Sequence, residues 1–168
     1  MSILAGILFC ITLVGADQVI KFFVLEYLKP VGYVDVIDNI LRFRYVENTG
    51  AIFGSFSAYT AVLTVVSIVL LVVVIYFLIT NKSKSKIINI CLLLMVSGGI
   101  GNIIDRIRLK YVVDFIEVLF VDFAVFNFAD CLITVGAFVL IFYLIYDMIK
   151  DSKNNDKVLS TEENNDAE

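Results

Sequence analysis

Two short polar insertions in an otherwise apolar chain carry the residue types needed for acid–base chemistry. One is the stretch 97–106, which holds three glycines, an amide and a carboxylate, and the other is the stretch 126–130. In each, an Asn precedes an Asp by three residues, a spacing at which side chains are neighbours on a helix. Because an Asn amide can orient a carboxylate by hydrogen bonding, the repeated spacing predicts that Asp105 and Asp130 meet as a matched pair.

The chemistry expected of such a pair is general acid–base hydrolysis. Two carboxylates in contact in a poorly hydrated site cannot both ionise cheaply, so they share one proton. One acts as the base that activates a water, and the other is the acid that protonates the oxygen of the carbonyl under attack. The chain has no histidine, which excludes Ser-His-Asp and Cys-His catalysis and imidazole metal sites. We expect no metal and no other cofactor.

The composition indicates a membrane protein. The 168 residues are 60% hydrophobic, with a mean hydropathy of +0.94, whereas soluble globular domains are about 45–50% apolar. The net charge of −4 comes from the segment after residue 146, which carries seven acidic residues and three lysines. The rest of the chain is neutral, so no basic patch points to a nucleic acid partner.

The hydropathy pattern predicts an all-α membrane protein whose four transmembrane helices lie at about residues 3–23, 58–79, 87–105 and 126–146. A small β element is expected in the loop at 26–57, where a strand at 41–46 can pair with 33–37 across the Asp38-Asn39 turn. The stretch 111–123 is too charged to span and is expected to pack at the membrane interface. Residues 1–150 are expected to form a single membrane domain, and 151–168 a disordered acidic cytoplasmic tail.

The direction of the helices predicts where the carboxylates lie. The connector 81–86 carries three lysines and no acid, which favours the cytoplasmic side, and the apolar start is expected to be a retained helix rather than a signal peptide. By helical rise, Asp17 lies roughly 20 Å along the first helix and Asp105 roughly 27 Å along the third. Asp130 lies roughly 24 Å from the far end of the oppositely directed fourth. All three are expected near the outer face of a hydrocarbon layer about 30 Å thick.

At these residues the chain resembles the lipoprotein signal peptidases, the type II signal peptidases of bacteria. The resemblance covers roughly residues 17–142. It rests on five short motifs: Asp17-Gln18, Asn48-Thr49-Gly50-Ala51 with Phe53-Gly54, Gly98 to Arg106, Val113-Asp114-Phe115, and Phe126-Asn127 with Ala129-Asp130. Each motif alone is weak, and the combination is highly specific.

The resemblance implies a four-helix aspartyl peptidase of the bacterial cytoplasmic membrane, with both termini cytoplasmic and an extracytoplasmic β element between the first two helices. Its active site would lie at the outer face, and its substrate would be a prolipoprotein cut before the diacylglyceryl-modified lipobox cysteine. Carried over, Asp105 and Asp130 are catalytic, and the residues that bind substrate or support the site are Asn48, Gly50, Ala51, Asn102, Arg106, Asn127, Ala129, Asp17, Lys21 and Asp114. The resemblance further implies contact with membrane lipids, a monomer, and inhibition by globomycin-type cyclic peptides.

Four alternatives remain open from the residues alone. Asp105 could pair with Arg106 or Arg108 while Asp130 only caps a helix. Membrane carboxylates also relay protons, so a small proton-coupled or ion-coupled carrier is possible. A Ser-Lys peptidase would use Ser55 or Ser57 with Lys21. A membrane scaffold without enzymatic activity would tolerate loss of either aspartate.

Overall fold

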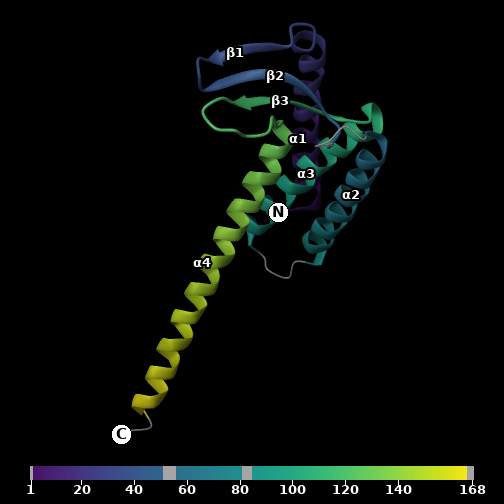
Figure 1. Cartoon of the computed structure of the whole chain (residues 1–168). Helices are drawn as coiled ribbons and strands as arrows, with labels where there is room; N and C mark the ends of the chain where they lie inside the picture. The colour runs from purple at the N-terminus through teal and green to yellow at the C-terminus, as the bar shows by residue number, and fades with distance from the viewer. Residues whose placement is uncertain (1, 51–55, 81–84, 166–168) are drawn as a thin grey trace.

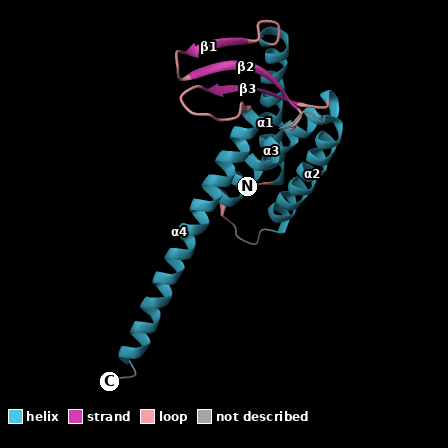
Figure 2. Cartoon of the chain, in the orientation of Figure 1, coloured by secondary structure: helices cyan, strands magenta, loops and turns pink. Residues whose placement is uncertain are grey.

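The computed structural model describes residues 2–50, 56–80 and 85–165, with side chains at 2–50, 61–80 and 85–151. This described part contains four helices long and apolar enough to cross a membrane and a three-stranded antiparallel sheet. The expected fold class is confirmed. Figure 1 shows the sheet covering one end of the helical bundle, and Figure 2 separates the helices from the strands by colour.

The helices begin and end at recognisable local signals. α1 (Ile3–Phe23) starts after Ser2, whose hydroxyl accepts a hydrogen bond from the Ala5 amide, and it continues into a π-helical turn, η1 (Val24–Leu28). The other helices are α2 (Phe56–Thr80), α3 (Lys86–Leu109) and α4 (Phe128–Asn165). α3 ends where Lys110 adopts a left-handed conformation with φ of 71°. This turn directs the chain straight into a strand.

α3 is the central helix of the bundle. Half of its span is buried, whereas the buried share is 11% for α1, none for α2 and 17% for α4. The other three helices each pack against it and leave most of their apolar side chains exposed, as a lipid environment allows. The buried residues of α3 include Gly98, Gly101, Asn102 and Asp105. The first polar insertion therefore lies inside the bundle.

The sheet has one strand that the sequence analysis missed. β1 (Tyr33–Ile37) pairs with β2 (Leu41–Asn48) in the expected hairpin, and β2 pairs on its other side with β3 (Val112–Val118). β3 occupies most of the stretch expected to pack at the membrane interface. Its first four residues are all buried, so the strand lacks the alternation of apolar and polar residues that identifies half-buried strands.

α4 is longer than expected. It runs to Asn165 and extends well beyond the other helices, through the segment for which disorder was expected (Figure 1). The composition of residues 151–168 is polar and charged, but it contains no glycine or proline. Lysine and glutamate are good helix formers, so nothing in this sequence stops the helix that begins in the membrane.

Close packing of α3 against α4 gives a first testable result. Gly98→Ala is expected to lower the free energy of unfolding by about 1–3 kcal/mol, the usual cost of overpacking. A Cβ at this position would collide with the Ala129 carbonyl oxygen and lie 2.8 Å from Ile133 Cγ1. Gly99→Ala is the matched control, because its Cβ would lie 3.4 Å from the side-chain carbon Leu71 Cδ1. Thermal unfolding in detergent compares the two, and equal melting temperatures would contradict the packing argument.

Candidate active site

A buried lysine gathers the polar residues of α1 and α3. Lys21 Nζ lies 3.0 Å from Asp17 Oδ2 and 2.9 Å from Asp105 Oδ2, and all three side chains are 2% exposed or less. The same ammonium donates a hydrogen bond to Asn102 Oδ1 at 3.0 Å. Asp17 lies one turn before Lys21 on α1, so the ion pair is an i, i+4 pair inside one helix. This buried ion cluster joins the two helices below the sheet.

Asp105 is fully engaged in this cluster. Besides Lys21, its carboxylate accepts hydrogen bonds from Gln18 Nε2 at 3.2 Å and from the Val113 amide at 3.1 Å. The contact with Val113 fixes the start of β3 against the end of α3. The Asp105 carboxylate thus faces an ammonium and two further hydrogen-bond donors inside the protein. Asp105 is therefore suited to hold the strand in place.

Asp130 caps α4 and also faces α3. Asn127 directly precedes the first residue of α4. Its side-chain Oδ1 accepts a hydrogen bond from the backbone amide of Asp130 at 3.0 Å, and its backbone amide donates one to Asp130 Oδ2 at 3.2 Å. This reciprocal pattern is a capping box, which is the role that one alternative gave to Asp130. The carboxylate does more than cap, because Asp130 Oδ1 accepts a second bond from Asn102 Nδ2 at 2.8 Å. Asp130 is half-buried.

Asp114 on β3 lies in the same network. It is 1% exposed, and its two oxygens accept hydrogen bonds from Asn48 Nδ2 at 2.7 Å and Asn127 Nδ2 at 2.6 Å. Burial raises the pKa of Asp114 to about 6, against the lowering effect of the two Asn donors. This value includes a smaller raising effect from the negative charge of Asp130 and a lowering effect from Lys21. Asp114 thus keeps its proton to a higher pH than an ordinary aspartic acid does.

Asn127 and Asn102 link these carboxylates in different ways. Asn127 contacts both Asp114 and Asp130 directly, and it also donates to Asn102 Oδ1 at 3.1 Å. Asp105, in contrast, is connected to Asp130 through Lys21 and Asn102. A proton-sharing pair needs carboxylates that are not already neutralised by a cation. The contacts therefore favour Asp114 over Asp105 as the partner of Asp130, and the pairing of Asp105 with Asp130 stays a prediction.

The other predicted site residues surround this network. Arg106 is half-buried and donates to Ser67 Oγ on α2 at 3.4 Å. This contact connects α2 to the site. Ala129 is fully buried against α3. Gly50 has a φ of +74° and donates its amide to Asn48 Oδ1 at 2.8 Å, a tight turn that suits glycine. Ala51 lies outside the described residues.

Gln18 was named in the Asp17-Gln18 motif but was not among the predicted site residues, and the structure places it in the site. Its amide donates to Asp17 Oδ2 at 3.1 Å as well as to Asp105, and its oxygen accepts from Arg108 Nη1 at 3.2 Å. An amide inside an apolar helix was the available signal. The Ser-Lys alternative loses support, because Lys21 is held by two carboxylates; Ser55 lies outside the described residues and the side chain of Ser57 is not described.

The sequence matches the family described as signal peptidase (SPase) II over residues 9–146. The chain belongs to the signal peptidase II family. The lipoprotein signal peptidase of Caldanaerobacter subterraneus subsp. tengcongensis is 42% identical over 130 residues, which cover 77% of this chain and 88% of that protein. The lipoprotein signal peptidase of Lactobacillus johnsonii is 38% identical over 136 residues, which cover 81% of this chain and 88% of that protein.

Two solved structures described as bacterial membrane enzymes share the fold of this signal peptidase II family member. One superimposes with a TM-score of 0.78 at 31% identity and covers 86% of this chain and 95% of its own. The other has a TM-score of 0.76 at 30% identity and covers 87% and 90%. The recognition of the family from its motifs is therefore confirmed, as is its placement among multi-pass membrane proteins of bacteria.

Proposed function

We propose that this chain is a membrane aspartyl endopeptidase that removes the signal peptide from prolipoproteins by cutting before the diacylglyceryl-modified lipobox cysteine. Family membership supports the coarser statement, a protease that cleaves prolipoprotein signal peptides. The observation that carries the aspartyl mechanism is the double contact of Asn127 with Asp114 and Asp130. It joins two carboxyl groups that belong to no ion pair among the described residues.

In this mechanism the two carboxyl groups divide the proton transfers. Asp130, which is half-buried, acts as the base and takes a proton from the attacking water. Asp114, which is buried and has a raised pKa, holds the shared proton and donates it to the oxygen of the scissile carbonyl. The resulting tetrahedral intermediate breaks down when Asp130 passes the proton it took from water to the leaving nitrogen and a hydroxyl of the intermediate returns a proton to Asp114, which re-forms the carbonyl and restores both carboxyl groups. No covalent bond to the enzyme forms, so neither a serine nor a cysteine nucleophile is required.

The depth of the site fits a lipidated substrate. Asp130 lies two residues into α4, and Asp114 lies on the strand that directly follows α3, so both carboxyl groups lie at the boundary of the bundle. A diacylated cysteine is anchored at the membrane surface by its acyl chains, and its peptide bond lies at the same depth. The enzyme therefore has no need to draw the bond into the middle of the bilayer.

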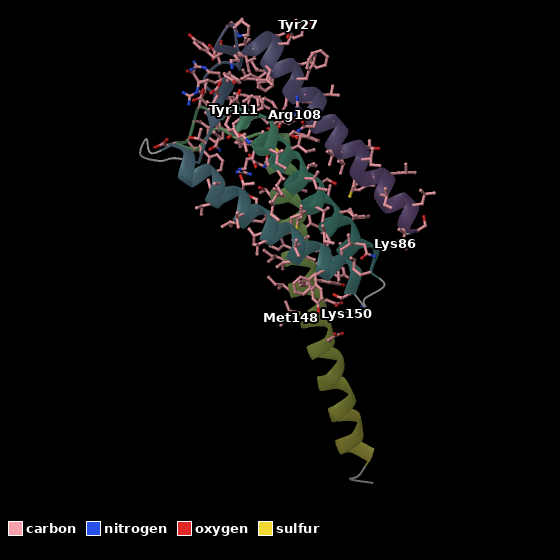
Figure 3. The ribbon with its side chains drawn as sticks, turned by 90° about the vertical axis from the view of Figure 1, so that its right-hand side faces the viewer. Tyr27, Lys86, Arg108, Tyr111, Met148 and Lys150 are labelled. Carbon is pink, nitrogen blue, oxygen red and sulfur yellow. The ribbon has the colours of Figure 1, made fainter. Side chains whose placement is uncertain are left out.

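The orientation in the membrane follows from the charges at the two ends of the bundle. Figure 3 shows Arg108 and Tyr111 at the sheet end and Lys86, Met148 and Lys150 at the opposite end. The compact lysine connector at 81–86 favours the cytoplasm for that opposite end. We propose that the sheet and the active site face outward and that both termini are cytoplasmic.

The proton on the carboxyl pair predicts a pH dependence. Since burial raises the pKa of Asp114 to about 6, the acid form is lost as the pH rises through this value, and kcat/KM is expected to fall on the alkaline side. The apparent pKa of this alkaline fall in kcat/KM belongs to the coupled pair of carboxyl groups rather than to one residue. Initial rates between pH 4.5 and 8.5 on a lipidated precursor measure it. A profile that rises steadily across this range would contradict a proton-donating carboxyl.

Substrate specificity tests the proposed function as a whole. Purified protein in detergent is expected to cleave a diacylglyceryl-modified precursor and to leave the same precursor without lipid intact, and a globomycin-type cyclic peptide is expected to block cleavage. The activity of the monomeric fraction from size-exclusion chromatography tests whether one chain suffices. Equal cleavage of both precursors would refute recognition of the lipid.

A further inference from the structure

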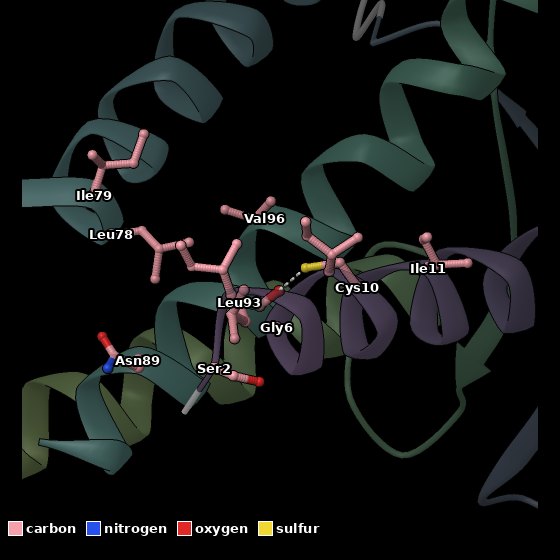
Figure 4. Close-up of a pocket in the computed structure, with 11 residues that line it drawn as sticks. Ser2, Gly6, Cys10, Ile11, Leu78, Ile79, Asn89, Leu93 and Val96 are labelled. Carbon is pink, nitrogen blue, oxygen red and sulfur yellow. Dashed lines mark hydrogen bonds between the residues drawn. The ribbon is translucent and has the colours of Figure 1, made fainter.

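An apolar groove lies at the end of the bundle away from the sheet. A cavity of about 520 Å³ is lined by the start of α1, the end of α2 and the first half of α3 (Figure 4). Its volume is within the range of ligand pockets, about 300–1,000 Å³. It is separate from the candidate active site, none of whose residues line it.

The groove has a buried floor and an exposed rim. Leu93 and Val96 on α3 are 5% and 6% exposed, whereas Ile3 on α1 and Ile79 on α2 are 85% and 77% exposed. The floor exists because α1 presents small residues there: Gly6 has no side chain, and Cys10 lies close to α3, with its sulfur 3.8 Å from the Leu93 carbonyl oxygen. An apolar groove between membrane-spanning helices with an exposed apolar rim is suited to acyl chains.

The mouth of the groove carries positive charge. α1 and α3 both begin at this end of the bundle, so two helix N-termini with their partial positive charge flank it. Lys86, the first residue of α3, is exposed and lies one turn before Asn89, which lines the groove.

We propose that this groove binds one acyl chain of an anionic phospholipid from the leaflet opposite the active site, with the phosphate at the lysine-bearing mouth. Basic pockets between transmembrane helices are suited to anionic headgroups, and apolar walls suit the chain. The site holds a lipid between α1, α2 and α3 without any contact with the catalytic carboxyl groups. The proposal therefore does not depend on the proposed peptidase mechanism.

The chain has no tryptophan, so a single Trp placed at the rim reports on the groove without background. Ile79→Trp places the reporter on a position that is already exposed. Ile149→Trp is the matched control. Ile149 lies on α4 near the same end of the bundle, is also exposed and does not line the groove. Its neighbours in sequence include Asp147 and Asp151 as well as Lys150. Both variants are reconstituted as full chains in phosphatidylcholine vesicles that contain brominated phosphatidylglycerol or brominated phosphatidylcholine, which quench Trp fluorescence on contact.

At Ile79→Trp the brominated anionic lipid is expected to quench with an apparent affinity at least about fivefold above that of the neutral lipid, the ratio expected from one lysine near the surface. At Ile149→Trp the ratio is expected to be near one. Replacing Lys86 by Gln in the Ile79→Trp background should bring its ratio close to one.

Three results would overturn the proposal. The first is equal quenching by the two lipids at Ile79→Trp, and the second is an anionic preference that survives loss of Lys86. The third is an Ile79→Trp reporter that no brominated lipid reaches, which would assign the groove to a second copy of the chain or to the signal peptide. Cleavage activity is measured alongside, so failure of the lipid site is distinguished from loss of the folded enzyme.

Discussion

Asp114→Asn and Asp130→Asn are each expected to lower turnover of a lipidated precursor by about 10²–10⁴-fold, the usual contribution of general acid or base catalysis. An amide can neither give nor take the proton, yet it keeps the shape of the carboxyl group and one acceptor oxygen. Both variants are therefore expected to remain folded. Single-turnover cleavage in detergent, with the melting temperature measured in parallel, separates a catalytic defect from unfolding.

Asp105→Asn is the variant that decides between the two possible partners of Asp130. It removes a charge that faces Lys21 at 2.9 Å, so its expected main effect is a lower melting temperature, with residual activity in whatever fraction stays folded. A folded, inactive Asp105→Asn protein beside an active Asp114→Asn protein would reverse the assignment and restore the pair expected from the sequence.

The sequence predicted the framework well because the relevant signals are local. Uninterrupted apolar runs gave the four helices, and the alternation at 41–46 gave the hairpin of β1 and β2. The stretch that became β3 is buried at its start, so its sequence shows no alternation. The continuation of α4 could not be predicted, because residues 151–165 are mostly Asn, Asp, Ser and Thr, which are modest helix formers.

The partner of Asp130 could not be deduced from spacing alone. Asp105 and Asp130 follow an Asn by the same three residues, and this repeat suggested equal roles. What separates them is a contact across helices: Lys21 of α1 neutralises Asp105, whereas Asp130 lies beside Asn127 and Asn102. A buried cation supplied from a distant part of the chain leaves no trace in the local sequence around the carboxylate it meets.

The buried ion cluster also explains how a residue that does not contact Asp130 can influence it. Asn102 can present either its oxygen or its nitrogen to Asp130. Because Lys21 Nζ donates to Asn102 Oδ1, the amide nitrogen is left to donate to Asp130 Oδ1. Together with Asn127 Nδ2, which donates to the same oxygen, Lys21 acts as a positioning residue that sets the orientation of the amide facing Asp130.

Lys21→Met is therefore expected to have the largest effect on stability. Removing one partner of a buried ion pair leaves an uncompensated charge and costs about 3–5 kcal/mol, here with Asp17 and Asp105 both left facing an apolar side chain. Chemical or thermal unfolding in detergent measures the loss. The exposed Lys29–Glu47 pair, 3.0 Å apart, supplies the control: Lys29→Met removes a similar ion pair in solvent, where such pairs contribute little, and should leave the melting temperature unchanged.

A double variant tests the electrostatic cause directly. Adding Asp105→Asn to Lys21→Met removes one of the stranded charges, so the double variant should be more stable than the sum of the two single losses predicts, which is positive coupling in a double-mutant cycle. In the folded fraction, loss of Lys21 should lower kcat with little change in KM, because Asn102 Oδ1 then keeps only the donor from Asn127 and the amide that faces Asp130 is held less firmly. Additive losses in the cycle would mean that Lys21 supports the fold through packing of its aliphatic stem rather than through its charge.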